Sequence, residues 1–161
     1  MKKVLSLALV LILMLSLVSC APKPKEFSKD GMTITLTNSF WEKAMDGYTI
    51  CYDSRKDAVF VLKEAFSLFD GAENLTLDQY AEMVRKNNES RSPSEIKKEE
   101  GLTIMEYTFL NESNGTKYAY MTTMFKTSDA FWLIQFTCAE SDYETHRASF
   151  IEWAKSVKFD A

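Results

Sequence analysis

The chain has 161 residues, with 19 basic and 23 acidic side chains and a formal net charge of −4 at neutral pH. A mildly acidic protein lacks the clustered basic face that nucleic-acid binding requires, so we expect no nucleic-acid partner. Hydrophobic residues make up 46% of the chain and aromatic residues 13%, which excludes a disordered or low-complexity protein.

The N-terminal segment has the pattern of an export signal. Lys2 and Lys3 precede an apolar run from Val4 to Val18, which is shorter than the about 20 apolar residues that a transmembrane helix needs. The run ends in Leu-Val-Ser-Cys at residues 17–20, which is similar to the lipobox of bacterial lipoproteins. The alternative is an ordinary secretory signal in which Cys20 has no special role.

The lipobox resemblance implies both an anchor and a location. Residues 1–19 would be a signal peptide cleaved between Ser19 and Cys20, and Cys20 would carry a diacylglyceryl thioether with acyl chains such as palmitate. Because two acyl chains hold a protein stably at a bilayer, we expect a lipid-anchored protein on the extracytoplasmic side of the cell membrane. Removing residues 1–19 takes away two lysines and no acid, which leaves 17 basic and 23 acidic residues and a net charge of −6.

Residues 20–25 contain two of the three prolines in the chain, Pro22 and Pro24. Alternating prolines favour an extended polyproline II conformation, so we expect residues 20–25 to form a short, semi-rigid tether. The remaining residues, 26–161, number 136, which is the usual length of one domain with its own core. The sequence therefore predicts a single domain after the tether.

Two cysteines besides Cys20 lie in separate predicted strands. A disulfide between Cys51 and Cys138 would suit a protein outside the cytoplasm, but it needs the two Cα atoms to lie within about 7 Å. The alternative is that both cysteines are small buried hydrophobic residues. The sequence leaves both alternatives open.

Three segments in the first half of the chain contain alternating apolar residues and are bounded by glycines or polar runs. This pattern predicts three strands. They cover residues 32–37, 48–52 and 58–64, of which the last two form a hairpin. Trp41 lies in the connector 38–46, which we expect to dock over one edge of the core. Phe66 and Phe69 lie in the loop 65–75, so part of that loop must be packed.

A helix follows this loop. Thr76 and Gln79 have the spacing of a capping box, in which the two side chains close the first helical turn. One face of the helix is apolar and consists of Leu77, Tyr80, Ala81 and Val84. The segment 87–94, which contains Pro93, ends the helix.

The second half of the chain is predicted to be a meander followed by a helix. We expect four strands, at residues 95–99, 102–110, 117–126 and 131–138. The polar strand 95–99 is typical of a sheet edge, whereas 131–138 is apolar on both sides and should be central and covered on both faces. Ser141 and Glu144 have the spacing of a second capping box, and one face of the helix that follows carries Tyr143, Arg147, Phe150, Ala154 and Val157.

These seven strands and two helices predict an α+β fold in which two main helices pack against an antiparallel β-sheet of about six or seven strands. Particular residues add to this order of elements: the opening Phe27 with Gly31 to Leu36, the helix start Leu75 to Tyr80, the strand 131–138, and Tyr143, Phe150 and Val157 to Phe159 at the end. With these residues the segment 27–159 resembles the PsbP-like superfamily, which is the fold of the photosystem II extrinsic subunit and of many bacterial lipoproteins. The resemblance implies an α/β/α sandwich.

The resemblance also bears on function. PsbP-like proteins are mostly binding or assembly factors without catalytic activity, and no residue here matches a known metal or partner site of the superfamily. The sequence itself has no Gly-x-Ser-x-Gly elbow, phosphate-binding glycine loop or dinucleotide fingerprint. His146 has no acidic or cysteine partner at i+3 or i+4, so we expect a surface histidine, although a cysteine–histidine nucleophile that uses Cys138 or Cys51 stays open. We expect no catalytic residue, metal or cofactor.

We therefore expect a non-catalytic binding or assembly module that acts on an envelope protein partner. Such a module should expose an apolar or aromatic patch, and Trp41, Phe66 and Phe69 are the candidate residues for it. The alternative is a small-ligand or lipid carrier, which needs an apolar pocket of at least about 300 Å³. A hydrolase that uses an unrecognised site is the third hypothesis.

Overall fold

The computed structural model describes residues 22–160. They form two antiparallel β-sheets and two α-helices, which confirms the predicted α+β class. The predicted signal peptide, with its predicted cleavage site at Ser19 and lipidation site at Cys20, lies outside the described residues. Within residues 22–160, no helix is long and apolar enough to cross a membrane.

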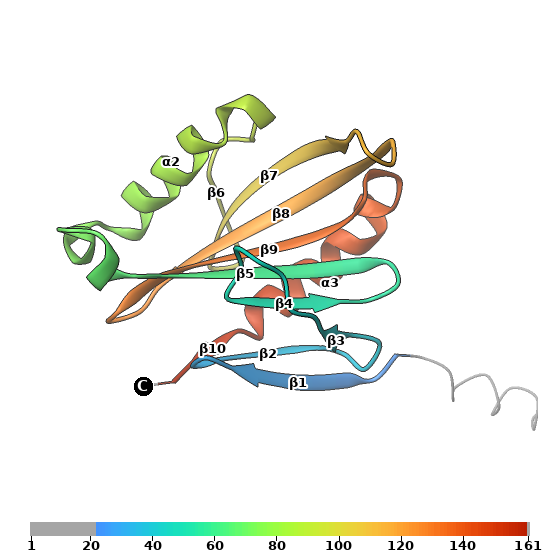
Figure 1. Ribbon diagram of the computed structural model, residues 1–161, viewed down its shortest axis with the longest axis horizontal. Helices are drawn as coiled ribbons and strands as arrows, with labels where there is room; N and C mark the ends of the chain where they lie inside the picture. The colour runs from blue at the N-terminus through green and yellow to red at the C-terminus, as the bar shows by residue number, and fades with distance from the viewer. Residues whose placement is uncertain (1–21, 161) are drawn as a thin grey trace, which may run out of the picture.

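The larger sheet has seven strands in the order β3-β4-β5-β9-β8-β7-β6, and every neighbouring pair is antiparallel (Figure 1). The strands are β3 Trp41–Glu42, β4 Ile50–Asp53, β5 Asp57–Ala65, β6 Lys97–Glu99, β7 Leu102–Asn111, β8 Thr116–Lys126 and β9 Ala130–Ala139. The predicted hairpin and meander are therefore present. The polar strand β6 lies at an edge of the sheet, as its charges predicted.

Strand β9 lies at the centre of this sheet, between β5 and β8. Its first nine residues are all buried, which confirms the prediction of a central strand covered on both faces. Successive side chains of a strand point to opposite faces. The side chains of Ile134 and Phe136 therefore point to one face of the sheet. Those of Phe131 and Leu133 point to the other face.

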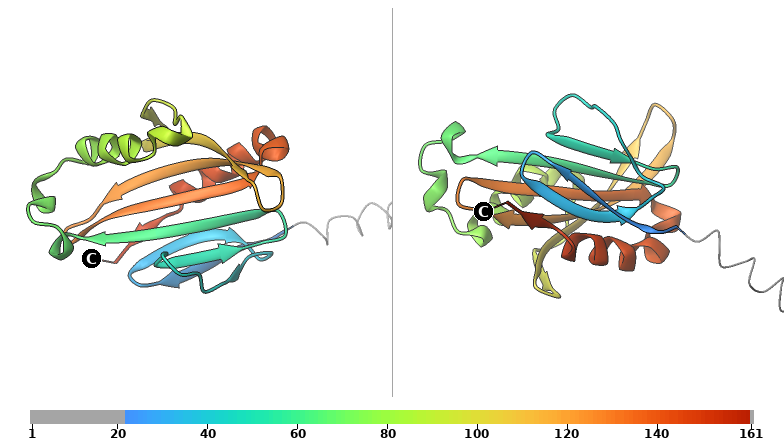
Figure 2. Two further views of the ribbon diagram at one scale, coloured as in Figure 1. Left: turned by 45° about the horizontal axis from the view of Figure 1, so that its top comes forward. Right: turned by 90° about the horizontal axis from the view of Figure 1, so that it is seen from below.

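Different elements cover the two faces of the larger sheet (Figures 1 and 2). Helix α2, Leu77–Asn87, packs on the face that carries Phe131 and Leu133. Helix α3, Tyr143–Lys155, packs on the opposite face together with the smaller sheet. The result is the expected α/β/α sandwich with an additional small sheet, and each face of the larger sheet has its own apolar core.

The smaller sheet has the strand order β1-β2-β10. Its strands are β1 Pro24–Lys29, β2 Met32–Thr37 and β10 Lys158–Phe159. The prediction that residues 32–37 share one sheet with the other strands is therefore wrong. Asp30 and Gly31 both have positive φ and make a tight turn, so β2 pairs with the strand immediately before it.

Strand β1 also changes the expected limit of the tether. Pro24 pairs with Thr37, and just before it the Lys23 amide donates to the Asn38 Oδ1 atom at 3.0 Å. Proline is tolerated there because it is the first residue of an edge strand, where no ladder hydrogen bond needs its missing N–H group. Pro24 and Lys25 therefore belong to the folded domain and not to a polyproline tether.

Only one of the two predicted capping boxes forms. At the start of α2, the Gln79 amide donates to the Thr76 hydroxyl at 3.2 Å and the Thr76 amide donates to the Gln79 side chain at 2.8 Å. The predicted box of Ser141 and Glu144 is wrong. A 3-10 turn over Glu140–Asp142 leads directly into α3, so Asp142 has helical φ and ψ and makes no side-chain cap.

A polar cluster joins α3 to the edge of the larger sheet. Arg147 donates to Glu99 of β6 at 2.8 and 2.6 Å and to Glu106 of β7 at 2.7 Å. Burial alone would raise the pKa of Glu106, but hydrogen bonds from Tyr143, Arg147 and Lys97 outweigh it and hold that pKa below its usual value. The hydrogen bonds from Arg147 also lower the pKa of Glu99.

These lowered pKa values predict an acid-sensitive contribution to stability. A carboxyl whose pKa is lower in the folded state stabilises the fold above its unfolded pKa, and this contribution disappears as the pH falls through the folded pKa. We expect Glu106→Gln to reduce the free energy of unfolding by about 2 kcal/mol at pH 7. In urea titrations the difference from wild type should shrink below about pH 4.5, the usual glutamate pKa. The exposed Glu112→Gln is the control, and a difference that does not change with pH would contradict the assignment.

Candidate functional site

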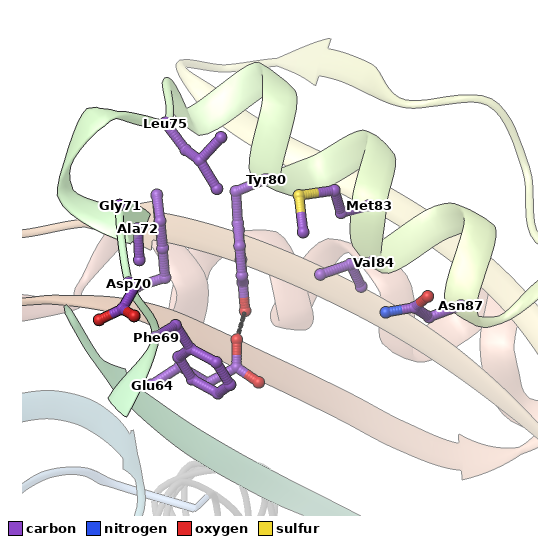
Figure 3. Close-up of a pocket in the computed structure, with 11 residues that line it drawn as sticks. Glu64, Phe69, Asp70, Gly71, Ala72, Leu75, Tyr80, Met83, Val84 and Asn87 are labelled. Atoms are coloured by element: carbon purple, nitrogen blue, oxygen red, sulfur yellow. Dashed lines mark hydrogen bonds between the residues drawn. The ribbon is translucent and has the colours of Figure 1, made fainter. Parts of the chain in front are cut away.

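A hollow of about 360 Å³ lies between helix α2 and the segment 66–75 that precedes it (Figure 3). Its walls are mostly apolar. Phe69 and Leu75 come from the segment, and Met83 and Val84 come from the helix. We call this hollow the α2 groove.

Aromatic rings form the inner part of the α2 groove. The Phe131 ring of β9 stacks on the Tyr80 ring with their centroids 4.1 Å apart and their planes 2° apart. Phe66 meets Phe131 edge to face at 5.1 Å. Because Phe131 belongs to the central strand, the groove is built on the most deeply buried element of the fold.

One partly buried polar contact lies among these rings. The Tyr80 hydroxyl donates a hydrogen bond to the Glu64 carboxylate of β5 at 2.7 Å, as Figure 3 shows. Burial, together with this hydrogen bond and the charge of Glu64, raises the pKa of Tyr80. Tyr80 therefore stays protonated near neutral pH and keeps its ring fixed in the groove wall.

Backbone contacts hold the segment 66–75 in place. The Lys126 ammonium donates to the carbonyl oxygens of Glu73 and Leu75 at 2.8 and 2.7 Å, and the Phe66 amide donates to the Asp129 carbonyl at 2.8 Å. Gly71 has φ +79°, a conformation that glycine adopts without strain. The groove is thus formed before anything binds, which reduces the entropy lost on binding.

Large apolar side chains are exposed at the mouth of the α2 groove. Phe69 is 54% and Met83 49% exposed, and Leu68, which precedes Phe69 in the chain, is 69% exposed. A single exposed apolar residue is ordinary, but several around one hollow are typical of a binding surface. This combination makes the α2 groove the candidate functional site.

The structure separates the three residues that the sequence suggested for an interaction surface. Phe69 lines the groove, and Phe66 packs on Phe131, which lines it too, so both loop residues contribute to one site. Trp41 is exposed in β3, where it lines a different hollow. Met83 was not predicted, because it lies beside the buried apolar face of the helix and is itself 49% exposed.

The second hollow lies near the start of the described chain and is lined by Pro22, Trp41 and His146 among others. The sequence predicted a surface histidine, and His146 is partly exposed where it lines this hollow, with 19% of its side chain accessible. Its Nδ1 atom lies 2.5 Å from the Asp57 Oδ1 atom, a contact between residues 89 positions apart. Asp57 is on a different element, so the residues next to His146 in the sequence do not reveal this partner.

Cys138 lies next to this pair but is a poor nucleophile. Burial, with smaller contributions from Asp57 and Asp142, raises the pKa of the Cys138 thiol to about 12, so the thiol is protonated at neutral pH. It does not line the second hollow. The arrangement therefore gives no support to a nucleophile that uses Cys138 and His146.

The disulfide between Cys51 and Cys138 does not form, because both cysteines are free and buried. Strand β5 lies between β4, which carries Cys51, and β9, which carries Cys138. Strands two positions apart in a sheet are separated by about 9.5 Å, beyond the reach of a disulfide. The alternative of two small buried hydrophobic residues is confirmed.

Comparisons with known proteins agree with this architecture. The fold is similar to the solution structure of the cyanobacterial PsbP protein (CyanoP) of Synechocystis, with 11% identity, a TM-score of 0.57, and coverage of 88% of this chain and 95% of that one. A mutant of the protein Mog1 matches with 10% identity, a TM-score of 0.51 and coverage of 88% and 97%. A crystal structure from Bacteroides thetaiotaomicron matches with 15% identity and a TM-score of 0.51, covering 85% of this chain and 48% of that one.

No protein-family model and no curated protein matches the sequence. At 10–15% identity the similarity to solved structures concerns the arrangement of elements and not the residues of a site. It agrees with the resemblance found in segment 27–159 of the sequence. The chain therefore has a PsbP-like fold.

Proposed function

We propose that this protein is a non-catalytic binding or assembly module, lipid-anchored through Cys20 on the extracytoplasmic side of the cell membrane, that binds an envelope protein partner in the α2 groove. The observation that carries the proposal is the exposure of Phe69 and Met83 in the walls of a preformed apolar hollow, with the exposed Leu68 next to Phe69 in the chain. Such side chains lose unfavourable contact with water when a partner covers them.

The position of the groove suits an anchored protein. Strand β1 begins at one end of the molecule, and the segment 66–75 lies at the opposite end (Figure 1). If the anchor is at Cys20, two residues before Pro22, the membrane is on the side of the β1 start. The α2 groove then faces away from the bilayer, where an envelope protein can reach it.

The groove suits a particular kind of partner segment. Its walls accept one or two apolar side chains, because Phe69, Met83 and Val84 leave little room for polar groups. The acidic residues Glu64 and Asp70 also line the groove, and Glu73 follows Asp70 in the same segment. We therefore expect a partner segment with an apolar anchor residue next to a basic residue.

The size of the groove supports a second candidate function. Its volume of about 360 Å³ exceeds the about 300 Å³ that a small-ligand site needs. A carrier of a small apolar molecule or lipid tail would use the same Phe69, Met83 and Val84 surfaces. The two functions differ in whether the occupant is a free molecule or a side chain of a partner.

The anchor can be tested with Cys20→Ala in the full chain. Without the thiol no thioether can form, so we expect the variant to leave the membrane fraction or to keep an uncleaved signal peptide. Cell fractionation and the mass of the purified protein are the measurements, and Cys51→Ser is the control for loss of a thiol. If the variant has the same distribution as the wild type and a mass that differs only by the substitution itself, Cys20 is a bystander in an ordinary secretory signal.

Partner binding can be tested with photo-crosslinkers placed at Phe69 and, as a control, at Leu110, which is 51% exposed and lies at the end of β7. We expect one envelope protein to crosslink in cells at Phe69 only, through a segment with an apolar and a basic residue. Replacing both Leu68 and Phe69 by Ser should lower the yield at Met83 at least about tenfold, because each side chain contributes about 1.5 kcal/mol or more. Equal crosslinking at Phe69 and Leu110 would contradict the proposal.

The carrier function can be tested by native mass spectrometry of protein purified from cells. A carrier should retain a small molecule, seen as a discrete mass increase. The buried Ala72 lines the groove, so Ala72→Leu should fill part of it and abolish that increase. A wild-type protein without any mass increase would exclude the carrier function and leave the partner-binding function intact.

A further inference from the structure

Three side chains that bind metals meet beside the second hollow, and each comes from a different element. Asp57 begins β5 and lies directly opposite Cys138 of β9 in the antiparallel register. His146 comes from the first turn of α3, which packs on that face of the sheet. A carboxylate oxygen, the thiol sulfur and an imidazole nitrogen of these residues all lie within 4.8 Å of one another.

The cluster is largely shielded from water. Cys138 is 2% exposed, and the side chains of Asp57 and His146 are 12% and 19% exposed. Within residues 22–160, the Asp57 carboxylate has one side-chain hydrogen-bond partner, His146. A buried carboxylate with a single partner keeps lone pairs available for a cation, and a buried charge is costly without compensation.

The ligand types indicate the class of metal. A carboxylate, an imidazole and a thiolate form a mixed oxygen, nitrogen and sulfur set, which suits zinc and similar transition metals, whereas calcium and magnesium prefer oxygen ligands only. With the thiol deprotonated by the metal, the set carries a charge of −2, which balances a divalent cation. The neighbouring Asp142 adds negative charge on the same side.

We propose that Asp57, Cys138 and His146 bind a divalent transition-metal ion of the zinc class. Because Asp57 and His146 also line the second hollow, the fourth coordination position opens towards it. Three protein ligands with one open position are typical of zinc sites that accept water or another small ligand. Arg55 and Lys56 lie in the same hollow, so their positive charges favour a small anion over a neutral molecule as the fourth ligand of the metal ion.

The site needs only a modest adjustment to hold the ion. Ligand atoms around a tetrahedral zinc ion are about 3.5 Å apart. The His146 Nδ1 and Asp57 Oδ1 atoms at 2.5 Å must therefore separate by about 1 Å, and the sulfur must approach by a similar distance. Rotation of the Asp57 and His146 side chains can provide this movement while the strands stay fixed.

The test uses the full chain, purified in detergent, treated with a chelator and kept reduced. We expect Co²⁺ to bind with one ion per chain and to give the thiolate-to-cobalt charge-transfer absorption, which Zn²⁺ should then abolish by displacement. The absorption should be absent in Cys138→Ser and unchanged in Cys51→Ser, whose buried cysteine lies on the other side of β5. The control thus removes a buried thiol without touching the proposed site.

A second variant keeps the test independent of core packing at Cys138. His146→Ala should lower the Zn²⁺ affinity at least about 100-fold, because changes to residues behind a metal ligand already cost 10–100-fold. Circular dichroism checks that each variant is folded. If Cys138→Ser does not fold, the Zn²⁺ affinities of His146→Ala and Asp57→Asn test the proposed site instead. The proposal is overturned if wild type gives no charge-transfer absorption, if Cys51→Ser abolishes it, or if His146→Ala binds Zn²⁺ as tightly as wild type.

Discussion

The burial of β9 on both faces is the constraint on which the rest of the fold depends. A strand in this position needs a hydrogen-bonding neighbour on each edge and an apolar layer on each face. Strands β5 and β8 are the hydrogen-bonding neighbours on its two edges. Helix α2 covers one face, and helix α3 with the smaller sheet covers the other. Each helix can therefore be understood as the cover of one set of alternating β9 side chains.

Both candidate sites follow from this strand. Phe131, at the start of β9, stacks on Tyr80 of α2 and forms the inner wall of the α2 groove. Cys138, at its end, points to the other face and lies beside Asp57 and His146. The sequence of one central strand thus positions an apolar site at one end of the molecule and a polar cluster at the other.

The features that the sequence predicted well depend on local chemistry. The Thr76 and Gln79 capping box, the hairpins and the central position of 131–138 are all encoded within a few neighbouring residues. The Ser141 box failed although its spacing is correct, because the 3-10 turn before α3 gives Asp142 a helical backbone. A pattern of side chains could not reveal which backbone conformation precedes the helix.

The features that the sequence missed depend on pairing over long distances. Whether Cys51 and Cys138 can bridge depends on β5 lying between their strands, which no local pattern encodes. The same register brings Asp57 opposite Cys138, and the packing of α3 adds His146. The α2 groove was predicted only in part. Phe66 and Phe69 indicated a packed loop, but the contribution of Met83 depends on where helix α2 lies relative to that loop.

The positions of the two sites imply that they act independently. Phe131 and Cys138 are seven residues apart on one strand, about 24 Å at 3.4 Å per residue, and they face opposite sides of a sheet. A strand that is hydrogen-bonded on both edges and packed on both faces does not bend easily, because protein interiors are as dense as organic crystals. A ligand that shifts side chains in one site by about 1 Å can be accommodated by rotamers there. The central strand that positions both sites is therefore also what isolates them from each other.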